Sequence, residues 1–275
     1  YYLINVTLII LVSFPIYWAF VSSIKPPNEL ITNTPTLFPI NPTFESYERI
    51  WNLEPTSSRG NIRSAFMNSA IVSIGTVIVS AVISTLAAYA LTILRTPFRY
   101  FIFLLIIMPI LIPGISLLIP LYKLVKELGL MNSYLGLILI HSTGMLTLGV
   151  FLMRNAFMSI PTSLREVALL EGSSELRIMF TVMLPLAIPG LLTLMVFALY
   201  GSWNDFILAF LFVNTIDMEM LNVFLMKLTF AGSQFDTFWG LLNAGAIISF
   251  VPIIIFYIFL QQYFVRGVTG SAVKE

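Results

Sequence analysis

Few residues of this sequence carry side chains that could do nucleophilic, acid–base or metal chemistry. The chain has one histidine, His141, and no cysteine, so no metal site with two histidine or cysteine ligands can form. It also contains no Gly-Lys pair and therefore no phosphate-binding loop of the form G-x-x-x-x-G-K-[ST]. We expect no catalytic residue, no metal site and no bound cofactor in this chain.

Charged and polar side chains gather in the segment 160–180, between two apolar runs. Within it, Ser163 followed by Glu166 fits a capping box, which predicts a helix that starts at Leu164. Gly172 can adopt the left-handed conformation that commonly ends a helix. The pattern therefore predicts a short helix that ends at a glycine turn.

A second short helix is expected directly after this turn. Ser173 or Ser174 can cap it, with Glu175 in its first turn beside the positive end of the helix dipole. Leu184-Pro185 then marks the entry to the next apolar run. The segment as a whole is predicted to form a helix, a glycine turn and a second helix.

The first of these helices has a surface suited to docking. Ala168 and Gly172 are four residues apart and share a face, where small residues let another surface approach the backbone. Leu164, Val167 and Ala168 form an apolar stripe among charges. Such a helix could enter a groove on a partner protein or lie on the lipid surface, and the residues alone leave both interpretations open.

The composition predicts that these short helices connect longer helices in a membrane. The chain is 58% hydrophobic and 10% charged, whereas about a quarter of the residues of soluble domains are charged. Its apolar runs are apolar on every side, unlike the alternating strands of a membrane barrel. A helix pairs its backbone groups within one segment, as lipid requires. The net charge of +1 gives no case for nucleic-acid binding.

We predict an all-α membrane protein in which residues 1–275 form a single transmembrane domain of six helices. Each predicted span is built on a charge-free window of at least 22 residues, which is long enough to cross a bilayer. The spans are residues 3–24, 64–94, 100–121, 134–154, 181–205 and 239–264. We interpret the first as a retained span rather than a cleaved leader.

The orientation of the helices is only partly fixed by charge. Lysines and arginines divide equally between the two sides, but the basic connection Arg95-Thr-Pro-Phe-Arg99 favours the cytoplasm. On that basis the proline-rich loop 25–62 is periplasmic or extracellular. The loop 160–180 and the tail 265–275 are then cytoplasmic.

Five residues are candidates for a pathway or gate. Pro109 and Pro113 each remove a helical hydrogen bond, so the third span is expected to be bent or broken and to pack against protein. Such a break can be tolerated as a kink or can line a gate. Asn68, Asn204 and Asn243 can hydrogen-bond between helices or line a path.

The ionisable residues at the apolar runs have less specific interpretations. Asp205 follows Trp203, which suits the membrane interface, so we favour an interfacial position for this acid over a substrate contact. His141 lies within a charge-free span and is interpreted as a packed, hydrogen-bonded side chain rather than a proton relay.

The segment 160–185 resembles the signature loop of the permease subunits of binding-protein-dependent ABC importers. In that family the signature is Glu-Ala-Ala, three residues and Gly, followed further on by Leu-Pro. The corresponding residues here are Glu166, Val167, Ala168, Gly172, Leu184 and Pro185. Val167 departs from the middle alanine, and Glu171 replaces the usual aspartate before the glycine.

Shorter motifs along the rest of the chain are similar to the same family, in particular to carbohydrate-type subunits related to the second maltose permease protein. They include Phe14-Pro-Ile-Tyr-Trp18, Ser22-Ser-Ile-Lys25, Trp203-Asn-Asp205 and a tail that ends in Gly-Ser-Ala-Val-Lys274. The resemblance implies the type I ABC importer permease fold, with a cytoplasmic coupling helix between helices 4 and 5.

The resemblance also implies partners and roles. A second homologous permease subunit would complete a heterodimer, two ATPase subunits would bind ATP and Mg, and an extracytoplasmic solute-binding protein would deliver the cargo. The residues implied to couple to the ATPase are Glu166, Val167, Ala168, Glu171, Gly172, Leu184 and Pro185. Gly270, Ser271 and Lys274 of the tail are implied to contact it as well.

The function that these features indicate is import of a sugar or oligosaccharide across the bacterial cell membrane, by a subunit that is not itself an enzyme. Another cargo, such as glycerol-phosphate, is the alternative within the family. A secondary transporter is disfavoured because the charge-free windows hold no Asp, Glu, Lys or Arg for ion coupling. A membrane-embedded enzyme would need a metal cluster, an aspartate pair or a nucleophile with a base. The sequence assembles none of these, so this function is disfavoured as well.

Overall fold

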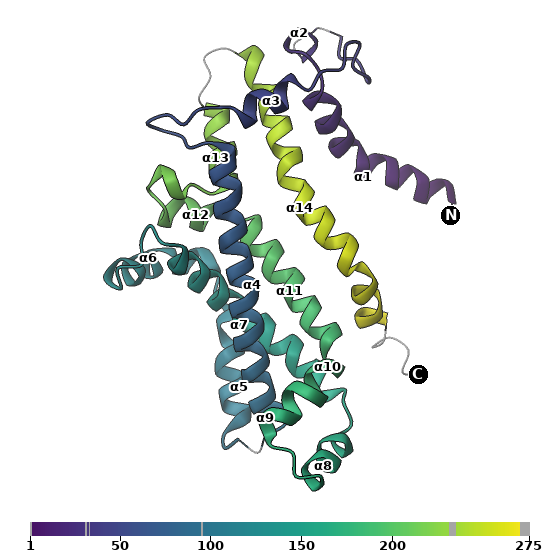
Figure 1. Cartoon of the computed structure of the whole chain (residues 1–275), viewed down its shortest axis with the longest axis vertical. Coiled ribbons are helices and arrows are strands. Elements are labelled where there is room, and N and C mark those ends of the chain that lie inside the picture. Colours follow the sequence, from purple (N-terminus) through teal and green to yellow (C-terminus); the bar gives the residue numbers. More distant parts are fainter. Residues whose placement is uncertain (1, 31, 33, 95, 231–234, 270–275) are drawn as a thin grey trace. The chain divides into compact units, whose positions relative to one another are not determined.

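The computed structural model describes residues 2–30, 32, 34–94, 96–230 and 235–269 (Figure 1). The described residues form helices and no strand, apart from an isolated bridge between Thr56 and Arg59. The all-α fold class is therefore confirmed. Within the described residues the helices long and apolar enough to cross a membrane are α1 (Tyr2–Ser23), α4 (Ile62–Thr92), α7 (Tyr134–Met158) and the Trp239–Phe259 part of α14 (Phe235–Thr269).

The predicted third span is broken, as its prolines indicated. Helix α5 (Arg99–Ile107) passes into a short 3-10 turn, and after Pro113 a second such turn leads into α6 (Leu118–Glu127). The two halves meet at 98°. At the break, Thr147 of α7 donates a hydrogen bond of 2.7 Å to the carbonyl of Ile106. The broken helix thus finds a backbone partner in protein, which lipid could not supply.

The predicted fifth span is also bent, which the sequence analysis did not anticipate. Helix α9 (Glu175–Ile178) continues through a π-helical stretch into α10 (Leu184–Leu186), and α11 (Ile188–Trp203) begins after Ala187. The halves Glu175–Leu186 and Ile188–Trp203 are bent by 79°. Pro185 and Pro189 flank the bend, and each lacks a backbone N–H donor. If each bent pair is one span, the helices account for up to six crossings.

The chain divides into two compact units, which are described separately. One comprises residues 1–69 and 213–255, and the other residues 70–212 and 256–275. Whether both belong to the single domain expected for residues 1–275 stays a prediction. In the first unit, α2 (Pro27–Leu30) and α3 (Glu45–Trp51) interrupt the loop 25–62. The same unit holds η4 (Ile216–Met218) and α13 (Leu221–Phe230), and the other unit holds the six-residue α12 (Ile207–Phe212).

The core of the second unit is built where α7 packs along α11 (Figure 1). Val150, Met153 and Phe157 lie on one face of α7 and are fully buried. The ring of Tyr89, from α4, meets Phe157 edge to face at 5.6 Å between centroids. This core supports the segment 160–180, because Ile160, Ala168 and Ile178 belong to the same cluster.

Helix α7 approaches α4 closely at Gly149. A Cβ added there would lie 2.2 Å from the Ser84 hydroxyl oxygen and 3.0 Å from a methyl group of Leu194. Small residues at such contacts let membrane helices approach to backbone distance. Gly144, on the same helix, has no atom within 4 Å of an added Cβ.

We expect Gly149→Ala to destabilise the protein by about 1–3 kcal/mol, because the added methyl group overpacks the α4–α7 contact. Gly144→Ala is the matched control and should leave stability unchanged or slightly raised, since alanine favours helix more than glycine does. Thermal unfolding of the purified chains in one detergent measures both. Equal midpoints for the two variants would contradict this description of the contact.

Candidate functional site: an exposed helix and its anchor

The helix predicted between the fourth and fifth spans is present as α8 (Thr162–Leu170), but its start differs from the prediction. Its N-cap residue is Pro161, and no side chain caps it. The first turn is closed instead by a bond of 3.3 Å from the Leu164 N–H to the Pro161 carbonyl. The predicted capping box of Ser163 and Glu166 is therefore wrong, because the helix starts one residue before its Ser.

The glycine turn that ends α8 is as predicted. Gly172 has a φ of +80°, in the left-handed region that side chains rarely adopt. The Ser173 N–H donates to the Ala168 carbonyl and the Gly172 N–H to the Leu169 carbonyl, both at 3.0 Å. These two bonds form a Schellman motif. Since nothing lies within 4 Å of an added Cβ, the backbone conformation and not lack of space requires glycine here.

The second short helix follows the turn in the predicted place. Helix α9 begins at Glu175, with Ser174 in the extended N-cap conformation but without a side-chain cap bond. Helix α9 leads through the π-helical stretch into α10, so residues 175–186 form one continuous helical rod. Leu184 and Pro185 lie within this rod and do not start a separate span.

The exposed surface of α8 differs in one residue from the predicted docking stripe. Ala168 is only 8% exposed and packs in the core of its own unit, so it is not one of the exposed side chains of the helix. A part for it in coupling to an ATPase stays a prediction. Leu164, Val167 and Leu170 are the exposed apolar side chains at a spacing of three, and Leu170 is 88% exposed. We call these three residues the outer stripe of α8.

Charged residues border the outer stripe. Glu166, Glu171 and Gly172 are all exposed. Leu170 was missed by the sequence analysis, although its place three residues after Val167 could have indicated it. The result is a short helix that shows apolar side chains and carboxylates outwards while Ala168 holds it to the protein.

One carboxylate anchors α8 to the long helix α4. Glu175 accepts a hydrogen bond of 3.0 Å from the Tyr89 hydroxyl and one of 3.3 Å from Nε of Arg165. The second Glu175 oxygen pairs with Nη2 of Arg165. The hydrogen bond to Glu175 raises the pKa of Arg165 above its usual value, so this arginine stays charged. We call these three residues the Glu175 anchor.

The Glu175 anchor escaped the sequence analysis because Tyr89 and Glu175 are separated by 86 residues. The sequence assigned Glu175 to the first turn of a helix, which is correct, but no local pattern names its partner. Through this group, α8, α9 and the end of α4 are joined by charge-assisted hydrogen bonds.

Asp205 has a structural role in the same unit. Its carboxylate accepts hydrogen bonds from the backbone N–H groups of Leu208, at 3.3 Å, and Ala209, at 2.8 Å, and so caps the start of α12. The Nε2 atom of His141 lies 3.7 Å from the same carboxylate. Both side chains are nearly buried, which agrees with a packed role for His141.

The candidate pathway residues have local partners. Asn68 is buried, and its amide donates to the carbonyls of Asp217 and Glu219 at 2.8 and 2.9 Å, which favours a packing role. Asn204 and Asn243 donate to carbonyls one turn back on their own helices. Pro109 and Pro113 lie at the exposed break in the third span. A part for any of them in a pathway stays a prediction.

The predicted tail contacts lie outside the described residues. Gly270, Ser271 and Lys274 belong to the segment 270–275, which the structure does not describe. Their proposed contact with an ATPase therefore stays a prediction.

The described residues thus hold two bent membrane helices and an exposed helix, α8, that is anchored to α4. Comparison with known proteins identifies the family. The family described as "Binding-protein-dependent transport system inner membrane component" matches residues 80–270. This chain belongs to that family. It is a transport component of the inner membrane rather than an enzyme, and the family implies partnership with an ATPase and a binding protein.

Individual relatives cover nearly the whole chain. The "Probable ABC transporter permease protein YurM" of Bacillus subtilis (strain 168) is 33% identical over 97% of this chain and 85% of its own length. The "Arabinooligosaccharides transport system permease protein AraQ" of Halalkalibacterium halodurans is 32% identical over 95% of this chain and 91% of its own.

A solved structure shows the same fold. It comes from a bacterial ABC transporter involved in the import of the acidic polysaccharide alginate, and it matches with a TM-score of 0.82 and 24% identity over 95% of both chains. The expected importer permease fold is therefore confirmed.

We expect Glu175→Arg to lower the thermal unfolding midpoint of the chain, because it places two cations together and leaves the Tyr89 hydroxyl without its acceptor. The pair is partly exposed, so removing the attraction alone is worth about 1 kcal/mol at most. Arg165→Glu in the same chain should restore most of the loss. If the double variant is no more stable than Glu175→Arg alone, the two side chains do not interact as described.

Proposed function

We propose that this chain forms half of the translocation pathway of an ATP-driven importer for a sugar or oligosaccharide, and that α8 is where it receives force from a cytosolic ATPase. The observation that carries the proposal is that α8 has an exposed apolar surface and is also bonded firmly to the rest of the protein. The outer stripe of α8 is open to a partner, while the Glu175 anchor ties the same helix to α4.

The proposed assembly has a second homologous permease subunit, two ATPase subunits that bind ATP and Mg²⁺, and an extracytoplasmic solute-binding protein. This chain has no phosphate-binding loop, so ATP would be bound by the ATPase subunits. The side on which α8 lies is part of the proposal, and the basic connection between the second and third spans supports a cytoplasmic position.

A saccharide cargo is supported by the proteins that this chain is similar to. One relative is named for arabinooligosaccharides, and the solved structure belongs to an importer of the polysaccharide alginate. Glycerol-phosphate remains the alternative cargo within the family.

The proposed mechanism follows the contacts of α8. An ATPase bound to the outer stripe would move α8 together with α9, because the Schellman hydrogen bonds at Gly172 fix the end of α8 to the residues that follow. The movement reaches α4 through Tyr89 and reaches α11 through the rod of α9 and α10. Two spans would then shift together and change access to the pathway from one side of the membrane to the other.

We expect Gly172→Val to reduce sugar uptake by about tenfold, because a β-branched residue at φ +80° strains the turn by roughly 1–3 kcal/mol. Gly172→Asn is the control, since asparagine tolerates the left-handed conformation and should keep most of the uptake. Uptake is measured in cells that express the whole transporter. Equal activity of the two variants would show that this turn does not transmit force.

We also expect Leu170→Asp to abolish co-purification with the ATPase, because it places a charge within the outer stripe. Leu176→Asp is the matched control, since Leu176 is 66% exposed on α9 outside the outer stripe. Both chains are expressed with their neighbouring transporter genes and purified through a tag on the permease. Retention of the ATPase by Leu170→Asp would overturn the assignment of the docking surface.

A further inference from the structure

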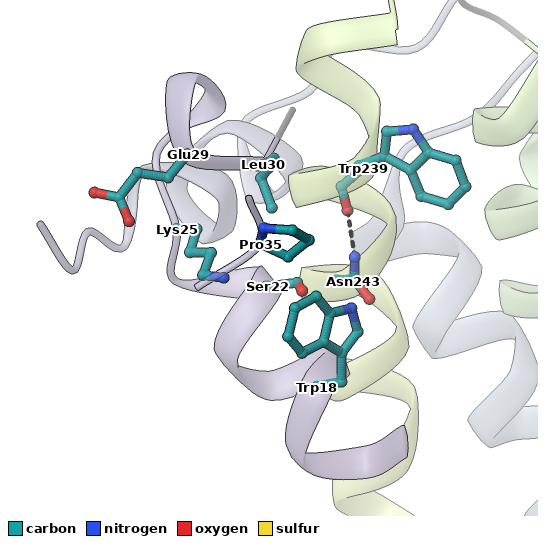
Figure 2. A pocket seen from close by; sticks show the side chains of 8 residues that line it. All are labelled: Trp18, Ser22, Lys25, Glu29, Leu30, Pro35, Trp239 and Asn243. Atoms are coloured by element: carbon teal, nitrogen blue, oxygen red, sulfur yellow. Dashed lines mark hydrogen bonds between the residues drawn. The ribbon is translucent and has the colours of Figure 1, made fainter. Parts of the chain in front are cut away.

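A small cavity lies in the first unit, where α1 ends beside α14 (Figure 2). It has a volume of about 110 Å³, which is several times the space that one water molecule requires. Its walls include Trp18, Ser22 and Lys25 from the end of α1 and the loop after it, and Trp239 and Asn243 from α14. The established family role of the chain assigns nothing to this cavity.

Lys25 is the chemically decisive residue of the cavity, because it is only 2% exposed. Among the described residues its ammonium donates a hydrogen bond of 2.6 Å to the carbonyl of Thr36, and it lies 4.8 Å from the centre of a Trp18 ring. An ammonium has three N–H donors, so this arrangement leaves donor capacity beside the cavity. Neither partner carries a negative charge.

Glu29, an acid in the cavity wall, already has hydrogen-bond partners in the backbone. The Glu29 carboxylate accepts hydrogen bonds of 2.9 Å from the backbone N–H groups of Ile40 and Asn41. Figure 2 shows it directed away from the Lys25 ammonium. Among the described residues, no carboxylate forms an ion pair with Lys25. Since buried cations are ordinarily paired, the cavity fits an anion that enters it.

The position of the cavity along the helices indicates which anion. The helix α1 ends at Ser23, and the charge-free stretch of α14 begins after Asp236. Both spans therefore leave the apolar layer where the cavity lies, and two tryptophans stand in its wall, as is common at membrane interfaces. Phospholipid phosphates lie at membrane interfaces, so such a position favours a phosphate as the anion.

We propose that this cavity binds a phosphate group, with Lys25 as its cationic ligand. Ser22 and Asn243 line the same space, and a hydroxyl and a side-chain amide can both donate hydrogen bonds to a phosphate. The phosphate can come from an anionic phospholipid headgroup or from free phosphate. The chemistry is the same for both, and the experiment separates them.

The test uses the full chain, purified in mild detergent, stripped of lipid and titrated with phosphatidylglycerol, phosphatidylcholine or inorganic phosphate. Native mass spectrometry reports bound lipid, and the thermal unfolding midpoint reports stabilisation by each probe. Binding and stabilisation by phosphatidylglycerol, without an effect of inorganic phosphate, would assign the site to a lipid headgroup. Stabilisation by inorganic phosphate would assign it to the free ion.

Lys25→Met should weaken binding of the effective probe by about tenfold, as expected for loss of a charged hydrogen-bond donor. Lys123→Met, at an exposed lysine of α6, is the matched control and should change nothing. Lys25→Arg keeps the charge and should retain binding, which separates loss of the ligand from misfolding. If Lys25→Met binds as well as the parent chain, or if neither probe binds, the proposal is overturned.

A counterion from the chain itself is tested by Asp236→Asn, because the side chain of Asp236 lies outside the described residues. Under the proposal, Asp236→Asn leaves probe binding unchanged. If it destabilises the chain as much as Lys25→Met does, and the double variant is no worse, Lys25 already has an internal partner and the phosphate site is refuted.

Discussion

The need to pair every backbone polar group inside lipid determines most of this structure. It forces the apolar runs into helices, and it confines charges to the connections, where water can reach them. It also governs the two exceptions, since the broken third and fifth spans expose carbonyls that need partners. Thr147 supplies one such partner to Ile106, which shows that a broken span is possible where another helix packs against it.

The same constraint supports the connection at 160–180 as the place where the proposed force enters. Charged groups such as Arg165 and Glu175 cannot be placed within the apolar spans at small energetic cost, but at a helix end they can join two elements. The Glu175 anchor does this with three donors' hydrogen bonds on one carboxylate. Helix α8 is thus held firmly although its outer stripe has no cover within the described part of the chain.

The sequence predicted features that depend on local chemistry and missed those that depend on distant partners. The helical spans, the left-handed Gly172 and the broken third span follow from charge-free length, glycine freedom and proline's missing donor. The start of α8 was wrong because Pro161 closes the turn in place of a side-chain cap. Tyr89 and the burial of Ala168 could not be predicted, because both arise from tertiary packing.

The inward position of Ala168 sharpens how the signature of this family should be interpreted. A small residue at this place was predicted to let a partner approach, yet its methyl group packs against the chain's own core beside Ile178. A larger side chain would therefore push α8 away from the protein before it affected any docking surface. The neighbouring Val167 points outwards and tolerates bulk, which accounts physically for its departure from alanine. Of these three successive residues, Glu166 and Val167 are exposed, and Ala168 holds the helix against the core.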